Sequence, residues 1–287
     1  MPRRVTPENW TSESISSQKS SFRFWFSATA SRIRGCRTLG EIALFQCAPP
    51  FWVRRAREGG TIRSVWETLS EPWRACVDLA WEAYRADSLP IGAVVADAEG
   101  RVLALGRNRI HERSGPAGVV FEHDLAHAEL NALLSFDRDA NDPRACVLYT
   151  TTEPCPLCAG ATRMTDVGEV RYASREPWAG SAAMFETVPY LRRRNVRVLG
   201  PENGRLEAVL VALQVERFLR SKPEILQGFL RFYGEVMPEA TRAGKKVYRS
   251  GLLRAMSEDG APSPAVVRAL DEVISSGMQA HLFDHDG

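Results

Sequence analysis

The stretch ACVLYTTTEPCPLCAGATRM, residues 145–164, decides the fold because it joins a buried strand directly to a helix. Residues 145–150 are an apolar run of strand length. Pro156 stands at the first position of a helix predicted over 156–164. Cys155 and Cys158 flank the start of that helix at i and i+3, close enough to bind one ion. The partial positive charge of a helix N-terminus favours their thiolate form.

The same alternation of strand and helix extends in both directions from this stretch. Ser70-Glu71-Pro72 has the capping hydroxyl, early acid and first-turn proline of a helix start. Apolar spacing predicts helices at 70–84, 125–135, 156–164 and 206–218, and strands at 89–96, 101–106, 145–150, 169–173 and 196–199. Strands that alternate with helices indicate an α/β layer sandwich.

Three segments differ in composition, which divides the chain into 1–64, 65–220 and 221–287. The last segment has only helical patterns, with residues 243–246 predicted as a connector between two helices. The first has neither period, and is read as a disordered tail, translated upstream sequence, a targeting peptide or a structural extension. Its aromatic residues argue against simple disorder: Phe22, Phe24, Trp25, Phe26, Phe51 and Trp52.

Charge is unevenly distributed along the chain. Residues 1–65 hold eleven Lys or Arg and four Asp or Glu, a net charge of +7, whereas residues 66–287 have a net charge of −5. A mildly acidic globular part argues against bulk electrostatic binding to nucleic acid, and it leaves room for a small local basic patch.

Cysteine usage and hydropathy bear on the compartment. Six cysteines are too few and too scattered for a disulfide scaffold, which favours a reducing compartment and a cytoplasmic protein. No run approaches the roughly 18 apolar residues that a membrane helix needs, so no membrane partner is expected.

His127-Ala128-Glu129, at the start of another predicted helix, completes the pattern begun by the two cysteines. A catalytic zinc takes three protein ligands and leaves one position for water, and His127 can join Cys155 and Cys158 as the third. Glu129 is better placed to carry protons than to bind the metal. A redox pair would leave His-Ala-Glu unexplained, and a structural zinc site would need a second Cys-x-x-Cys, which the sequence lacks.

These residues resemble the cytidine and deoxycytidylate deaminase superfamily, whose nucleobase deaminases carry His-x-Glu followed by Pro-Cys-x-x-Cys. The resemblance covers roughly residues 70–220 and includes 89–95, 106–109 and 149–155. It implies a three-layer α/β/α sandwich around a mixed five-stranded sheet, with 65–220 as the zinc deaminase domain and 221–287 as added C-terminal helices.

The resemblance also assigns roles to single residues. It implies Zn²⁺ as the cofactor, with His127, Cys155 and Cys158 as its ligands and Glu129 as the catalytic proton shuttle. It implies substrate-binding roles for Asn108, Ala128, Pro90, Gly92 and Ala93, although Asn108 is also a plausible turn residue. The remaining histidines have no metal-ligand context, and two cysteines are expected to pack in the core: His111, His123, His281 and His285, and Cys76 and Cys146.

The base is left open by these motifs, because zinc and Glu129 suit cytosine, adenine and guanine alike. The tRNA adenosine deaminases of the superfamily carry Ala-Arg-Asp-Ala-Lys-Thr-Gly where this chain has residues 174–180, with Trp178 in place of the lysine. Trp178 is expected either to pack under the C-terminal helices or to stack on a base. The loop at 109–126 is expected to form a mobile rim over the cavity.

We therefore expect a zinc-dependent hydrolase that deaminates a small-molecule nucleobase or nucleoside. The alternatives are a tRNA adenosine deaminase and a non-catalytic zinc-binding protein of the same fold. The resemblance also allows a homodimer, which no sequence feature shows independently.

Overall fold

The structure is a computed structural model that describes residues 64–202, 204–221 and 223–283. The chain divides into two units, Met1–Gly60 and Thr61–Gly287, and the description below concerns the second. The expectation of an N-terminal extension over 1–64 falls on residues that lie, except for Ser64, outside the described part of the chain.

A mixed five-stranded sheet forms the centre of this unit, in the order β2-β1-β3-β4-β5. Its strands are β1 Gly92–Ala96, β2 Val102–Arg107, β3 Val147–Thr152, β4 Glu169–Ser174 and β5 Arg197–Leu199. β1 is antiparallel to both β2 and β3, whereas β3, β4 and β5 are parallel to one another. Parallel strands need a crossover connection, and α6 (Pro156–Met164) provides it between β3 and β4.

Helices cover both faces of the sheet, which confirms the predicted three-layer α/β/α sandwich. On one face, α5 (Ala128–Leu134) and α6 pack with two short helices, α7 (Met184–Thr187) and α8 (Pro189–Arg192). On the other, α4 (Glu71–Arg85) and α9 (Gly204–Arg220) cover the sheet, and α3 (Val65–Thr68) joins the same core.

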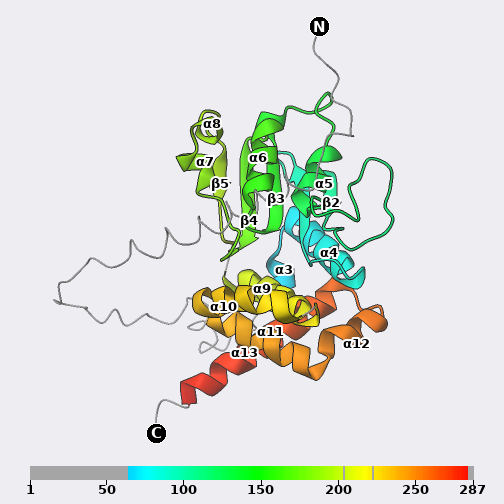
Figure 1. The fold of residues 1–287 in the computed structure, drawn as a ribbon, viewed down its shortest axis with the longest axis vertical. Helices are drawn as coiled ribbons and strands as arrows, with labels where there is room; N and C mark the ends of the chain where they lie inside the picture. The colour runs from blue at the N-terminus through cyan, green and yellow to red at the C-terminus, as the bar shows by residue number, and fades with distance from the viewer. Residues whose placement is uncertain (1–63, 203, 222, 284–287) are drawn as a thin grey trace, which may run out of the picture. The chain divides into compact units, whose positions relative to one another are not determined.

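The C-terminal helices pack beside α9, at one end of the sheet (Figure 1). They are α10 Pro223–Val236, α11 Pro238–Ser250, α12 Leu252–Glu258 and α13 Ser263–Phe283. The core that α4 and α9 share with the sheet continues into α11 and α13 through Val247, Val266 and Leu270. Within the described residues, no helix combines the length and hydropathy that a membrane crossing requires. The division at residue 220 into a deaminase domain and an extension stays a prediction.

Close contact between α5 and the sheet fixes the start of α5. A Cβ atom on Gly106 of β2 would lie 2.2 Å from the Ala128 carbonyl oxygen and 2.2 Å from the Ala132 nitrogen. Gly92 of β1 plays the same part toward α4, because a Cβ there would lie 2.1 Å from the Cys76 carbonyl oxygen. These two glycines allow one helix on each side to pack directly on the β1–β2 hairpin.

Three predicted elements begin two or three residues too early. The strand predicted at 145–150 is β3, Val147–Thr152, because Pro143–Ala145 form a turn of 3-10 helix that ends at Cys146. The helix predicted at 125–135 begins at Ala128, because His127 has the extended conformation of an N-cap residue, with φ −74° and ψ 151°. The strand predicted from 89 begins at Gly92, because a hydrogen bond from Ile91 N to Leu89 O, 2.7 Å long, turns the chain there.

The connector predicted at residues 243–246 was also wrong, since these residues lie inside α11. Gly244 faces α9, and a Cβ atom added to it would lie 2.7 Å from Val215 Cβ and 2.8 Å from the Ala212 carbonyl oxygen. The glycine that resembles a helix breaker in sequence is therefore a close helix–helix contact in the fold.

Gly244→Ala is predicted to lower the free energy of unfolding by about 1–3 kcal/mol, because the added methyl group overpacks the α9–α11 contact. Gly234→Ala is the matched control, since Gly234 is also inside a helix but has no atom within 4 Å of an added Cβ. That control should gain up to about 1 kcal/mol from helix propensity. Urea unfolding of both variants measures the difference, and equal effects would contradict the packing role.

Candidate active site

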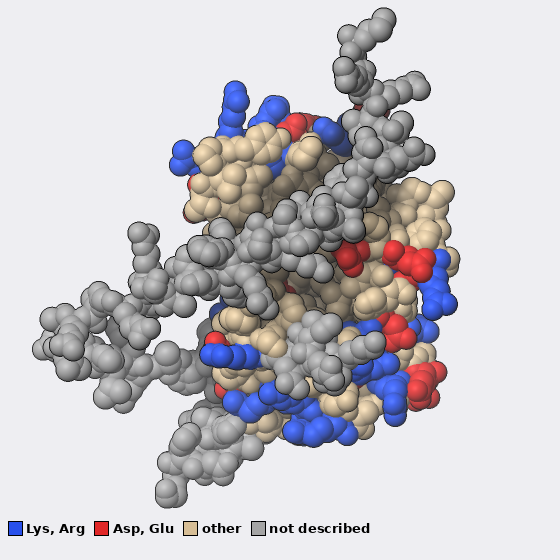
Figure 2. Space-filling model, viewed as in Figure 1, with Lys and Arg blue, Asp and Glu red and all other residues tan. Residues whose placement is uncertain are grey.

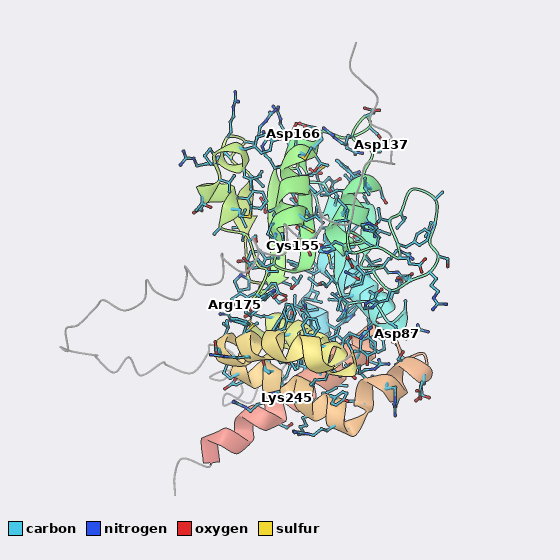
Figure 3. The ribbon with its side chains drawn as sticks, viewed as in Figure 1. Asp87, Asp137, Cys155, Asp166, Arg175 and Lys245 are labelled. Carbon is cyan, nitrogen blue, oxygen red and sulfur yellow. The ribbon has the colours of Figure 1, made fainter. Side chains whose placement is uncertain are left out.

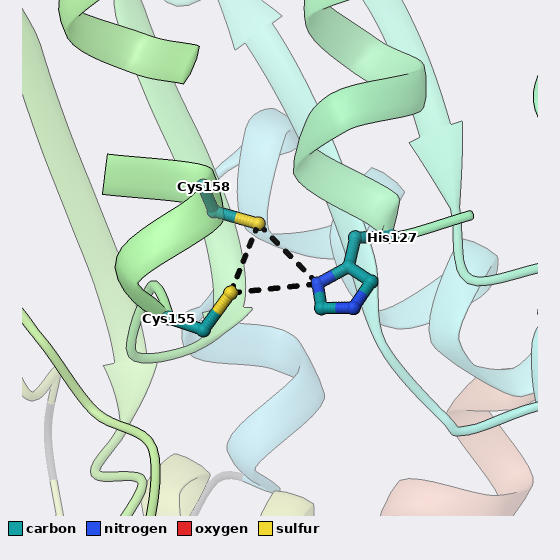
Figure 4. A group of neighbouring side chains, drawn as sticks. All are labelled: His127, Cys155 and Cys158. Carbon is teal, nitrogen blue, oxygen red and sulfur yellow. Dashed lines mark hydrogen bonds between the residues drawn. The ribbon is translucent and has the colours of Figure 1, made fainter. Parts of the chain in front are cut away.

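Three side chains from two helix starts converge on one point (Figure 4). His127 caps α5 and Cys155 caps α6, while Cys158 lies in the first turn of α6. The distances are 3.6 Å between the two sulfurs, 3.6 Å from Cys155 Sγ to His127 Nδ1 and 3.4 Å from Cys158 Sγ to the same nitrogen. Among the described residues, these three side chains form the group of histidine, cysteine or carboxylate ligands that lie close enough together to hold a metal ion.

The spacing of these atoms fits zinc. Tetrahedral zinc with Zn–S near 2.3 Å and Zn–N near 2.0–2.1 Å places two sulfurs roughly 3.8 Å apart and a sulfur and a nitrogen roughly 3.5 Å apart. The observed separations of 3.6, 3.6 and 3.4 Å lie close to those values. Two thiolates and one imidazole are also the donor set that zinc accepts in catalytic sites.

The electrostatics of the site favour the thiolate form of Cys155 beside the buried carboxyl group of Glu129. Hydrogen bonds from Cys158, then from His127, lower the pKa of the Cys155 thiol to about 4 against the cost of its burial. The hydrogen bond with Cys155, followed by burial, raises the pKa of Cys158. Glu129 is 3% exposed, and its burial raises the pKa of its carboxyl group. A carboxyl group of raised pKa is suited to accept and release protons.

A cavity of about 730 Å³ opens beside the three ligands, and His127, Glu129 and Cys155 line it. Its walls are largely apolar, with Leu89 and Ile91 from the segment before β1 and Phe218 and Phe229 from α9 and α10. In Figure 3, Cys155 lies between the sheet and the C-terminal helices. Mostly apolar walls with a few polar groups are typical of a small-molecule site.

Most of the predicted substrate-binding residues lie outside the walls of this cavity. Ala93 is fully buried in the core under α5 and α6, and Gly92 is pressed against α4. Pro90 is buried, while its neighbours Leu89 and Ile91 are the ones that face the cavity. The substrate-binding roles of these three residues stay predictions.

Asn108 and Ala128 are both buried close to the site. The side-chain oxygen of Asn108 accepts a hydrogen bond from Ile110 N at 3.3 Å, and its backbone N–H donates to the Ile91 carbonyl at 3.0 Å. These contacts match the alternative in which Asn108 shapes the turn after β2. Ala128 occupies the first position of α5, where a backbone N–H has no acceptor within its own helix. Their roles toward a substrate stay predictions.

Trp178 lines the cavity and packs against the C-terminal helices at the same time. Its ring lies 5.2 Å from Phe229 and 4.9 Å from Phe232, both on α10, and the residue is 52% exposed. Both alternatives from the sequence are therefore compatible with its position.

Two glutamates hold the Trp178 loop; both lie in stretches that the sequence singled out, 149–155 and 174–180, but neither was given a role. Glu153 accepts hydrogen bonds from Glu176 N at 3.3 Å and Ala182 N at 3.1 Å. Glu176 accepts from Trp178 N at 3.0 Å and from the Tyr233 hydroxyl of α10. Both glutamates line the cavity, so α10 is bonded to the site itself. Glu153 directly precedes Pro154-Cys155, and that adjacency was the available signal.

A buried amide holds the loop predicted as a rim at 109–126. Asn131 is 1% exposed, accepts from Val120 N at 2.8 Å, and donates to the carbonyls of Val120 at 3.0 Å and Arg107 at 3.2 Å. Ile110 and His111 of this loop line the cavity. His111 and His123 take no part in the metal group, as expected, and His123 accepts from Leu125 N at 3.0 Å in the loop. His281 and His285 lie where no side chain is described.

The end of α9 contributes polar cavity residues that the sequence did not indicate. Gln214 and Arg217 line the cavity beside Phe218, and so does Ser221, directly after the helix. The apolar spacing of α9 gave no reason to expect a second, functional face, because isolated polar residues in a core helix resemble its solvated side. Of the other cysteines, Cys76 and Cys146 are buried at 0% and 3% exposure, as predicted.

Comparison with known proteins agrees with this geometry. The family described as "Cytidine and deoxycytidylate deaminase zinc-binding region" matches residues 67–174. The guanine deaminase of Bacillus subtilis is 31% identical over 120 residues, which cover 41% of this chain and 71% of that protein. The chain belongs to the cytidine and deoxycytidylate deaminase family.

Other relatives are matched over part of their length. A tRNA(Ile)-lysidine synthase of Deinococcus radiodurans is 32% identical over 145 residues, 50% of this chain but 23% of that protein. The chain thus spans about a quarter of this curated relative. Among solved structures, the guanine deaminase from Nitrosomonas europaea is 24% identical with a TM-score of 0.38, covering 63% of this chain and 98% of that one.

Cys155→Ser in this deaminase-family chain is predicted to lower zinc content from about one ion per chain to near zero, because it removes one of three ligands. Cys146→Ser is the matched control, since Cys146 is buried away from the metal group and should keep its zinc. Elemental analysis of the purified proteins decides the matter. Full zinc content in Cys155→Ser would contradict the assignment.

Proposed function

We propose that this protein is a zinc-dependent hydrolytic deaminase that releases ammonia from the exocyclic amine of a nucleobase or nucleoside. The observation that carries the proposal is a buried carboxylate, Glu129, in one cavity with His127 and Cys155. A metal group of three protein ligands, with a carboxylate beside it, suits attack by water on a carbon that bears an amine.

The chemistry divides between the metal and the chain. A zinc ion held by His127, Cys155 and Cys158 supplies a Lewis acid that lowers the pKa of water to about 7. Glu129 accepts a proton from the attacking water and delivers it to the departing amine, which leaves as ammonia. The product is the corresponding oxo base. Burial of Glu129 keeps bulk water away from this proton.

A small-molecule substrate is supported by the aromatic wall of the cavity. Phe229 of α10 and Trp178 form part of its wall, and Tyr233 bonds α10 to Glu176 on the same wall. The similarity to guanine deaminase and, at 31% identity over 88 residues, to a probable cytosine deaminase of Schizosaccharomyces pombe points the same way. The free thiols of Cys76, Cys146, Cys155 and Cys158 support a cytoplasmic location.

A second candidate is deamination of adenosine within tRNA, which one surface feature favours. Arg242, Lys245, Lys246 and Arg249 are exposed at i, i+3, i+4 and i+7 along α11. Figure 2 shows Lys and Arg gathered over the C-terminal helices. Such a row attracts phosphates. A tRNA-specific adenosine deaminase of Haemophilus influenzae is 33% identical over 90 residues. We rank this candidate second because α10 contributes to the cavity wall, and a wall of this kind favours a small molecule over an RNA strand.

Substrate class is decided by measuring ammonia release from cytosine, cytidine, guanine, guanosine and adenosine, with a tRNA anticodon stem in parallel. The proposal predicts turnover with at least one small molecule. Turnover of the anticodon stem alone would establish the second candidate, and no turnover at all would favour a non-catalytic zinc protein.

Glu129→Gln is predicted to keep its zinc and its fold yet lose kcat by about 10²–10⁴-fold, because the amide cannot carry the proton. Glu186→Gln, at an exposed position on α7, is the matched control and should retain full activity. Zinc content, circular dichroism and steady-state kinetics separate the two effects. Near-normal kcat in Glu129→Gln would refute the assigned role.

A further inference from the structure

Gln214 is a buried polar residue on the cavity wall whose side chain has no hydrogen-bond partner among the described residues. It is 3% exposed, and it is the first residue along α9 that lines the cavity. Its amide atoms are accessible from the cavity, so a ligand there can both donate to the amide and accept from it.

Other polar side chains of the cavity already have partners. Arg217 donates to the carbonyl oxygens of Asp87 and Ser88 and to the Ser221 hydroxyl. Glu176 accepts from Tyr233 and Trp178.

The same holds for four further groups on this wall. Glu153 binds two backbone N–H groups of the Trp178 loop. His111 Nδ1 lies 2.8 Å from the Asp87 carbonyl oxygen, and Thr152 accepts from Ser174 at 3.5 Å. Arg220 pairs with Asp87 at 3.5 Å. Outside the residues assigned to the metal and the proton, Gln214 is therefore the one amide, carboxylate or guanidinium group on the described wall that has no partner.

The position of Gln214 along α9 places it in the same cavity as the reaction centre. Toward the start of the helix, Glu207 binds the Arg175 guanidinium and backbone N–H, so this part of α9 lies against the end of β4. Toward its end, Arg217 contacts Asp87 and Ser88. Gln214 lies between these two contacts and shares its cavity with Glu129.

The chemistry of a primary amide indicates what it binds. The amide presents one acceptor oxygen and two N–H donors side by side, which match an edge where an N–H stands next to a C=O. A base bound for deamination directs its exocyclic amine toward Glu129, so a different edge must meet Gln214. Guanine and free cytosine have such an N–H/C=O edge, and adenine has no carbonyl.

We propose that the Gln214 amide binds the N–H/C=O edge of the substrate and makes the site specific for oxo bases, guanine or cytosine, over adenine. This inference rests on the proposed deaminase function and adds its substrate class. A site that pairs with both groups of this edge rejects a base that lacks them, because its own polar groups then stay unpaired.

Paired substrates that keep the reacting amine but lack this edge provide the test. 2-Aminopurine is guanine without the carbonyl and its adjacent N–H, and 4-aminopyrimidine is cytosine without them. In the zinc-loaded native chain, kcat/KM should favour the oxo base of at least one pair. Gln214→Met, which keeps the shape and removes the amide, should reduce that ratio by about 30- to 100-fold, mainly by lowering kcat/KM for the oxo base.

Dissociation constants measured on the Glu129→Gln background should show the same loss of preference, which separates binding from turnover. An equal fall for both members of a pair would indicate a packing effect and overturn the inference, as would an unchanged ratio. These outcomes leave the proposed function intact, because the native chain is then active. Failure of the native chain to turn over or bind any of the four compounds would overturn both.

Discussion

Convergence of two helix starts on one point is the constraint on which the site depends. His127 and Cys155 cap α5 and α6, and their ligand atoms lie 3.6 Å apart although 28 residues separate them in sequence. Direct packing of α5 on Gly106 sets one helix start, and the passage from β3 into α6 sets the other. A displacement of either helix by an ångström would exceed the tolerance of metal–ligand distances, which is about 0.2 Å.

The C-terminal helices are bonded to this centre through a short chain of contacts. Glu153, next to the metal-binding segment, holds the loop that carries Glu176, and Glu176 accepts a hydrogen bond from Tyr233 on α10. Burial raises the pKa of the Tyr233 hydroxyl, so it remains a hydrogen-bond donor. In the described structure, α10 is thus joined to the cavity wall by a polar contact as well as by the aromatic contacts of Trp178.

Sequence patterns predicted the parts of this structure that depend on local chemistry. The α6 bounds were predicted without error, because Pro156 and the flanking cysteines specify that start. The ligand group and the layered fold followed from motif and periodicity. Long-range packing was not predictable from the sequence. Gly244 resembles a helix breaker, and only its contact with α9 explains it. The cavity residues of α9 can be identified only from the contact of that helix with the segment at Asp87.

Metal ligands can be predicted from a sequence motif more reliably than the residues that form a cavity wall. Metal ligands are fixed by bond lengths, so their spacing in sequence reflects geometry. A cavity wall is fixed by which side of a strand or helix faces inward, and a shift of one residue reverses it. On the segment before β1, the cavity is lined by Leu89 and Ile91, whereas Pro90 between them is buried. Gln214, which we propose selects the base, comes from α9, an element outside the motif that holds none of the metal ligands.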